Sequence, residues 1–224
     1  MGPSSLNFGD VRVVVTTRDD GDQSQSASDA RGIPLGPDGV AKPCTFVHQV
    51  HGARVVVVDR AIGPMELDAD AIVTTRACVP IGVLGADCSL IGLKSREGVI
   101  GVAHAGWRGL LAGVVEGCVE QMRALGAHEI EAIIGPTIGP ECYEFSRSDL
   151  APLVERFGEE VHVVRDDGSD ALDLVAGVTI ALSRAGVEKR VRLGGCTACD
   201  PDLYSWRAGH DHARHALMIW RERA

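Results

Sequence analysis

Three short stretches of this sequence place a residue able to bind a metal ion beside glycine or another small residue. They are Gln49-Val50-His51-Gly52, Ala86-Asp87-Cys88 and Ala103-His104-Ala105-Gly106-Trp107-Arg108-Gly109. Imidazole nitrogens and a thiolate suit zinc, and three such ligands leave a fourth position open. Zinc held in this way lowers the pKa of bound water to about 7 or polarises a substrate oxygen. His51, Cys88 and His104 are therefore candidate metal ligands, and Cys88 and His104 are candidate catalytic residues.

The spacing of these residues leaves other interpretations open, because ligands from separate strands have no fixed separation in sequence. Cys88 could be a buried structural cysteine, and each histidine could be a hydrogen-bonded loop residue. A different chemistry would use Cys88 as a thiolate nucleophile and His104 as its base, as in a cysteine hydrolase or deamidase. Such a nucleophile would be alkylated readily and would work without metal.

Polar residues near the three stretches are candidates for contacts with a substrate or with the metal ligands. Arg108 could bind phosphate through its fork of donors or pair with a carboxylate near the start of a helix. Gln49 could bond to the edge of a base or satisfy the end of a strand. Asp87 is a candidate for proton transfer or for orienting a ligand, and His48 is interpreted as a structural neighbour. Three aspartates in a turn-rich stretch are expected to be solvated, namely Asp59, Asp68 and Asp70.

The cysteine pattern argues against a secreted disulfide framework. The chain has seven cysteines, an odd number, and they lie far apart except for Cys196 and Cys199. That pair has Cys-x-x-Cys spacing but no second pair, so a zinc site there would need nearby histidines, namely His210, His212 and His215. We interpret the pair as part of a structural loop.

The elements that must position these residues are predominantly strands in the first half of the chain. Apolar, β-rich runs predict strands over 11–17, 45–47, 54–58, 71–74, 79–84, 90–93, 99–103 and 130–134, near 191 and over 217–220. Helical spacing predicts helices over 107–125, after Ser148 as far as Phe157, and over 172–185, each followed by a glycine. Strands and helices do not alternate regularly, which favours an α+β or layered α/β sandwich over a doubly wound sheet.

Length and composition favour one soluble domain. The 224 residues are 45% hydrophobic, and no apolar run reaches the roughly 18 residues of a membrane span. The first ten residues lack the features of a signal peptide, so we expect a cytoplasmic protein. A net charge of −9 with scattered basic residues disfavours nucleic acid as a partner. The oligomeric state is left open.

Residues 18–38 form a polar stretch rich in Asp, Ser and Gly. Such a stretch has too little apolar surface to offset the entropy lost on ordering. We therefore predict a mobile loop over 18–38 that shapes the choice of substrate.

Further motifs extend the pattern along the chain: Gly135-Pro136-Thr137-Ile138-Gly139-Pro140-Glu141-Cys142-Tyr143-Glu144, Leu172-Asp173-Leu174 and Cys196-Thr197-Ala198-Cys199-Asp200-Pro201. In this order, from about Thr16 to Trp220, the sequence resembles the bacterial YfiH family, also called the polyphenol oxidase or laccase-domain family. The resemblance implies a layered α/β/β/α sandwich in a single domain. It also implies a zinc ion bound by His51, Cys88 and His104.

The resemblance further implies an enzyme that uses purine nucleoside and phosphate, by phosphorolysis of adenosine, inosine and methylthioadenosine, with adenosine deamination as a second activity. An older description of the family is a copper-dependent oxidase of phenols, so copper is the alternative metal. One cysteine and two histidines cannot hold the several coppers that a laccase needs, which disfavours that chemistry. A non-enzymatic or editing role in the quality control of cell-wall precursors is a further alternative.

Two departures from the family pattern are visible. Asp19-Asp20-Gly21-Asp22 replaces the usual Gly-Gly-x-Ser run after Thr16-Thr17-Arg18, which is a reason to expect altered substrate contacts in this loop. Thr137 and Glu141 stand where the family often has cysteines. Neither of these two residues belongs to the implied zinc triad.

Overall fold

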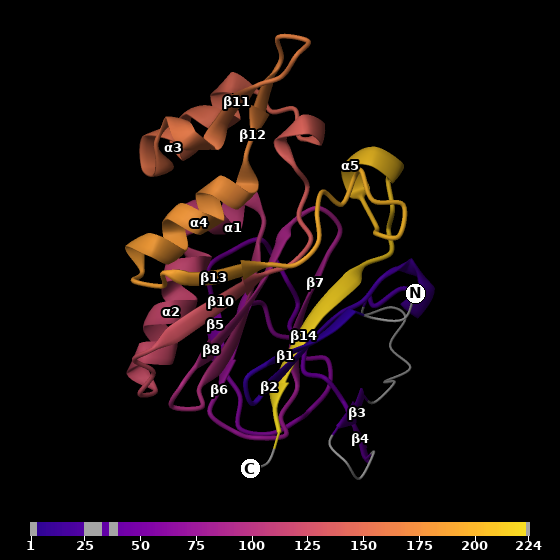
Figure 1. The fold of residues 1–224 in the computed structure, drawn as a ribbon, viewed down its shortest axis with the longest axis vertical. Helices are drawn as coiled ribbons and strands as arrows, with labels where there is room; N and C mark the ends of the chain where they lie inside the picture. Colours follow the sequence, from indigo (N-terminus) through magenta and orange to yellow (C-terminus); the bar gives the residue numbers. More distant parts are fainter. Residues whose placement is uncertain (1–3, 25–32, 36–39, 223–224) are drawn as a thin grey trace.

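The computed structural model describes residues 4–24, 33–35 and 40–222, which form two packed sheets with helices along one side (Figure 1). The larger sheet has six strands in the order β13 (Lys189–Arg192), β10 (Ile130–Ile134), β8 (Ser89–Ser95), β9 (Ile100–Ala105), β6 (Ala71–Thr74) and β5 (Val55–Val57). The smaller has four, in the order β1 (Ser4–Phe8), β2 (Val11–Val15), β14 (His215–Arg221) and β7 (Ile81–Gly85). Two hairpins complete the strands: β3 (Ile33–Leu35) with β4 (Val40–Lys42), and β11 (His162–Val164) with β12 (Asp170–Leu172).

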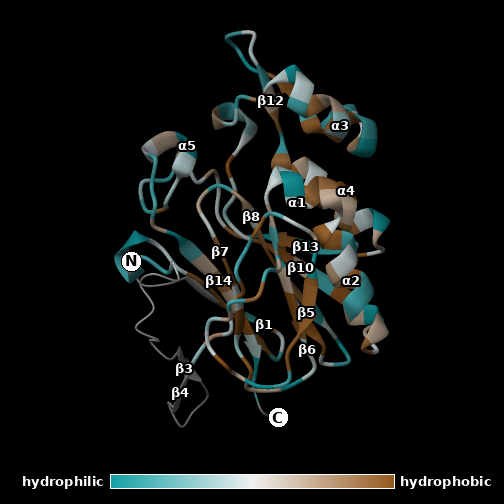
Figure 2. Cartoon of the chain, turned by 180° about the vertical axis from the view of Figure 1, so that it is seen from behind, coloured by the Kyte–Doolittle hydropathy of each residue, from teal (hydrophilic) through white to brown (hydrophobic). Residues whose placement is uncertain are grey.

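The six-stranded sheet is apolar on both faces because one face packs on helices and the other on the second sheet. Within β6, Ala71 and Val73 join the cluster under the helices, whereas Ile72 joins the cluster between the sheets. Strands buried on both sides read as continuous apolar runs, which is why their positions could be predicted from sequence. Figure 2 shows this hydrophobic colour along β5 and β6, with mixed colour on α2.

Three helices cover the outer face of the six-stranded sheet, namely α1 (Trp107–Ala112), α2 (Val114–Ala124) and α4 (Leu174–Arg184), and α3 (Arg147–Phe157) packs on α1 and α4 (Figure 1). A short helix, α5 (Trp206–Gly209), lies beyond the N-terminal end of β14 (Figure 1). Three 3-10 turns were not predicted, namely η1 (Arg18–Asp20), η3 (Pro140–Cys142) and η4 (Glu159–Val161).

The predicted helices need three corrections. The helix expected over 107–125 is two helices, because Gly113 adopts a left-handed conformation with a φ of 91°. The third helix begins at Arg147 rather than after Ser148, since the side chain of Ser146 accepts a hydrogen bond from the Asp149 amide and caps it. The fourth begins at Leu174, where Asp173 caps it in the same way.

The α+β layered sandwich expected from the sequence is confirmed. In the described part of the chain, the outer face of the four-stranded sheet is covered not by a second helical layer but by the segment of Cys44 and Phe46, which packs on Met218. Of the loop predicted over 18–38, the described residues form η1, the turn up to Ser24 and β3, and the others lie outside the described residues. None of the described helices has the length and apolar character needed to cross a membrane.

Candidate metal centre

Strand pairing brings the three predicted metal ligands together. In the antiparallel β8–β9 pair, Leu90 lies opposite His104 and Ser89 lies opposite Ala105, so Cys88, directly before β8, lies beside the end of β9. His51 comes from the loop before β5, and its Nε2 lies 3.9 Å from the Sγ of Cys88. One ligand atom from each of His51, Cys88 and His104 lies within 4.8 Å of the other two. The imidazole rings of His51 and His104 meet edge to face, with centroids 4.9 Å apart.

A buried carboxylate that sequence reasoning missed orients this group. Asp70 is fully buried rather than solvated, so that expectation was wrong. Its Oδ1 lies 2.9 Å from Nδ1 of His104 and accepts a hydrogen bond from the His51 amide at 3.0 Å. Its Oδ2 accepts from the Gly52 amide at 2.7 Å. Because Nδ1 of His104 faces Asp70, Nε2 is the nitrogen left for a ligand. The position of Asp70 directly before a buried apolar strand is the signal that could have revealed it.

The electrostatics of the group favour a thiolate at Cys88. Burial opposes ionisation of this thiol, but the neighbouring His104 and His51 lower its pKa below the usual value. Burial also opposes the charged form of His104, but Cys88 and Asp70 raise its pKa overall. A thiolate is the form that binds a metal ion and also the form that acts as a nucleophile.

The residues present fit a zinc ion in donor type and in space. Gly106 follows β9, and a Cβ added there would lie 2.9 Å from both the Cys88 Sγ and the Cδ2 of His51. A side chain at position 106 would therefore collide with both candidate ligands, and glycine avoids this collision. Two imidazoles, one thiolate and an open side match a catalytic zinc site.

Left-handed backbone conformations occur at two non-glycine residues beside the centre. The φ angles are 59° at His51 and 97° at Asp87. Such conformations cost about 1–3 kcal/mol each and persist where surrounding contacts determine them. For His51, the contacts are the Asp70 hydrogen bonds to the loop.

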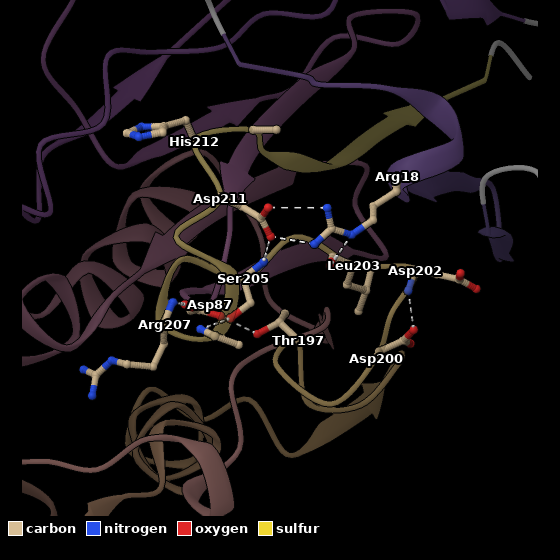
Figure 3. Close-up of polar contacts among 12 residues, drawn as sticks. Arg18, Asp87, Thr197, Asp200, Asp202, Leu203, Ser205, Arg207, Asp211 and His212 are labelled. Atoms are coloured by element: carbon tan, nitrogen blue, oxygen red, sulfur yellow. Dashed lines mark hydrogen bonds and ion pairs between the residues drawn. The ribbon is translucent and has the colours of Figure 1, made fainter.

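The buried Asp87 holds a C-terminal loop against the site (Figure 3). Its Oδ1 accepts a hydrogen bond from the Thr197 hydroxyl and its Oδ2 accepts one from the Arg207 amide, both at 2.7 Å. Asp211 of the same loop accepts from the Ser205 amide and pairs with the guanidinium of Arg18, which lies in η1. Because both carboxylate oxygens of Asp87 are engaged, its environment favours an orienting role over proton transfer.

The centre opens into a pocket with a volume of about 730 Å³. Arginine and tryptophan side chains line it, namely Arg108, Arg207, Arg214, Trp107 and Trp206. The guanidinium carbon of Arg108 lies 4.1 Å from the ring centroid of Trp107, and no described carboxylate lies within ion-pair distance of Arg108. The guanidinium carbon of Arg207 lies 4.8 Å from the ring centroid of Tyr143. The pocket therefore combines cationic and aromatic surface beside the candidate metal ligands.

Two other residues named from the sequence have structural contacts. The amide nitrogen of Gln49 donates to the Leu84 carbonyl and its oxygen accepts from the Leu84 amide, both at 2.8 Å. This arrangement fits the strand-end alternative for Gln49 and engages both polar atoms of its amide. His48 is exposed, with Nδ1 2.7 Å from Oδ1 of Asp68. Cys196 and Cys199 lie in a separate group.

Comparison with known proteins adds independent information. A family model described as multi-copper polyphenol oxidoreductase laccase matches residues 5–222. A purine nucleoside phosphorylase of Streptomyces griseus is 38% identical over 202 residues, covering 85% of this chain and 78% of that protein. One of Streptomyces coelicolor is 36% identical over 179 residues, covering 78% and 74%. The crystal structure of the hypothetical protein YfiH from Bacillus licheniformis shares the fold, with a TM-score of 0.79 at 20% identity over 99% of this chain and 97% of that one.

Proposed function

Because the chain belongs to the multi-copper polyphenol oxidoreductase laccase family, and its Streptomyces relatives are named purine nucleoside phosphorylases, we propose that it is a zinc-dependent purine nucleoside phosphorylase. The proposed substrates are adenosine, inosine and methylthioadenosine, with inorganic phosphate as the nucleophile. One observation carries the proposal: the candidate ligands His51, Cys88 and His104 line a single pocket with Arg108, which forms no ion pair with any described carboxylate.

The arginines of the pocket support phosphate as a substrate. The chain has a net charge of −9 and repels anions overall, so binding phosphate requires a local cationic surface. Arg108 has its fork of donors free of described carboxylates, and such a fork matches two phosphate oxygens. Arg207 is fixed by donation to the Glu144 carbonyl at 2.8 Å, which keeps a second cation at the pocket wall.

The aromatic side chains of the pocket support a purine. Trp206 is 46% exposed and contacts the ring of His212 edge to face, with centroids 5.2 Å apart. Trp107 also lines the pocket, with the Arg108 guanidinium over its ring. Flat aromatic surfaces favour stacking with a planar base, and a neighbouring cation favours the phosphate beside it.

The proposed reaction forms a bond between a phosphate oxygen and the ribose anomeric carbon while the bond from that carbon to the base nitrogen breaks. The base leaves with the bonding electrons and takes up a proton, giving free purine and ribose 1-phosphate. Arg108 binds and orients the phosphate, and the pocket walls exclude water from the anomeric carbon. A bound zinc ion would supply Lewis-acid polarisation of a substrate atom.

The decisive experiment measures products from adenosine and inosine with and without added phosphate. Phosphorolysis predicts free base and ribose 1-phosphate only when phosphate is present. Adenosine deamination instead predicts inosine and ammonia without a phosphate requirement. Conversion of no purine nucleoside by the zinc-loaded protein would contradict the proposal.

The lowered pKa of Cys88 beside His104 favours one second candidate, a thiolate hydrolase or deamidase. The two functions differ in their response to zinc. A zinc ligand is protected from alkylation by iodoacetamide when zinc is bound, and chelation abolishes turnover. A nucleophilic Cys88 is alkylated in either state, and turnover survives chelation.

A further inference from the structure

A second group of metal-binding side chains lies where the turn after β10 meets the loop after β13. Cys142 ends η3, and its Sγ lies 3.4 Å from the Sγ of Cys199. The Cys199 Sγ also lies 3.7 Å from Oε1 of Glu141. One ligand atom each from Glu141, Cys142, Cys196 and Cys199 lies within 4.8 Å of the other three. None of the four lines the pocket described above.

We propose that Glu141, Cys142, Cys196 and Cys199 form a second zinc site, structural in role. Zinc binds sulfur at about 2.3 Å, so tetrahedral ligands lie roughly 3.8 Å apart, close to the separations seen here. Three thiolates are soft ligands that select zinc over magnesium or calcium. Four protein ligands close the coordination sphere, as in structural zinc sites, whereas the centre in the pocket has three.

The backbone around Cys196 is arranged to present its sulfur. The amides of Cys199 and Asp200 donate to the Cys196 carbonyl at 3.2 and 3.1 Å, which folds the Cys-x-x-Cys segment into a tight turn. The Gly139 amide donates to the Sγ of Cys196 at 3.1 Å. Hydrogen bonds of this kind orient a metal-bound thiolate and stabilise its charge. Both segments that supply ligands therefore already contact each other through the sulfur of Cys196.

The position of the group explains what a second ion would do. Tyr143 follows Cys142 and lines the pocket, and Thr197 lies within the Cys-x-x-Cys turn and donates to Asp87 (Figure 3). A zinc ion would join residues 139–142 to residues 196–199. It would thereby fix the positions of Tyr143, which lines the pocket, and of Thr197, which holds the pocket residue Asp87. Binding converts the three thiols to thiolates and releases their protons to solvent.

The test titrates metal into the full-length protein after metal removal under reducing conditions, with Co²⁺ as the spectroscopic probe. The wild type is expected to bind two equivalents. Cys88→Ser and Cys199→Ser should each bind one. Thiolate-to-cobalt charge-transfer absorption follows the number of cobalt–sulfur bonds, so Cys88→Ser should keep most of it and Cys199→Ser should lose most of it. Cys78→Ser, which belongs to neither group, should match the wild type.

Two further variants test the second site while keeping its three cysteines, Cys142, Cys196 and Cys199. In the Cys88→Ser background, Glu141→Gln should weaken zinc binding, and Glu141→Cys should strengthen it by adding a fourth thiolate. The proposal is overturned if Cys88→Ser binds no metal, or if the metal that Cys88→Ser binds is retained when Cys199→Ser is added. It is also overturned if Cys142 and Cys199 form a disulfide that persists in reduced protein supplied with zinc. A wild type that binds a single equivalent, lost in Cys199→Ser, would contradict the pocket centre instead.

Discussion

Asp70 Oδ1 and His104 Nδ1 lie 2.9 Å apart in the interior of the protein, and the same carboxylate receives the amides of His51 and Gly52. One buried side chain therefore sets the orientation of two of the three candidate ligands. It holds His104 through the ring and His51 through the backbone of its loop. We therefore expect Asp70 to act as a positioning residue for the candidate metal centre.

Asp70→Asn is expected to lower zinc affinity at the pocket centre by about 10- to 100-fold, the usual effect of losing a partner that orients a ligand. An amide replaces one acceptor oxygen with a donor, so it cannot accept from His104 and both loop amides together. Competition with a chelator measures the change. Asp68→Asn is the matched control, since exposed Asp68 contacts His48 and no ligand. Equal affinities in the two variants would refute this role.

Gly106→Ala is expected to weaken metal binding, because the added Cβ would lie 2.9 Å from the Cys88 Sγ and from Cδ2 of His51. Overpacking typically costs about 1–3 kcal/mol, which corresponds to roughly 5- to 150-fold in affinity. Zinc titration by calorimetry provides the measurement. Gly195→Ala is the control, since a Cβ there has no neighbour within 4 Å. If Gly106→Ala binds zinc as well as this control, the space beside Gly106 is unimportant.

Arg108→Ala is expected to raise the KM for phosphate by about 10-fold or more, because a charge-assisted hydrogen bond typically contributes about 1.5–3 kcal/mol. The KM for nucleoside should change much less. Steady-state kinetics with varied phosphate give both values. Arg96→Ala removes an exposed arginine that faces Glu129 and should leave both unchanged. A phosphate KM that does not respond to Arg108→Ala would place the phosphate site elsewhere.

His215 is expected to make stability fall in mild acid. Burial lowers its pKa to about 4; the charge of Asp87 opposes this shift, and the charges of Arg214 and Arg18 add to it. Between that pKa and the unfolded value of about 6.5, the unfolded chain binds a proton that the native protein does not. Stability from this group is therefore complete above pH 6.5 and decreases as the pH falls towards 4, by at most about 1.4 kcal/mol per pH unit.

Urea unfolding of metal-free protein between pH 4.5 and 7.5 tests this dependence without any contribution from metal release. His215→Phe should reduce the slope of stability against pH in that window. His128→Phe replaces an exposed histidine and should keep the wild-type slope. The same slope in all three proteins would show that His215 does not control the acid response.

The sequence allowed prediction of those parts whose signal is local. The strands over 71–74 and 130–134 coincide with β6 and β10, because apolar β-branched runs are typical of strands buried on both faces. The break at Gly113 was not predictable from periodicity, since the apolar stripe continues from α1 into α2. Asp70 was missed because turn-rich surroundings conceal its burial. The contact between Cys142 and Cys199 joins residues 57 positions apart, a separation that no local pattern reports.

The central place of β14 in the four-stranded sheet has a consequence for synthesis on the ribosome. Its Ala216 amide donates to the Thr16 hydroxyl across a separation of 200 residues, and β14 lies between β2 and β7. At about 5–20 residues per second, this distance takes roughly 10–40 s to translate. Throughout that interval β2 lacks its partner β14, and β7 lacks the same partner from its own synthesis onward, so both present unpaired edges that favour aggregation. We therefore expect nascent chains to depend on chaperones until β14 emerges.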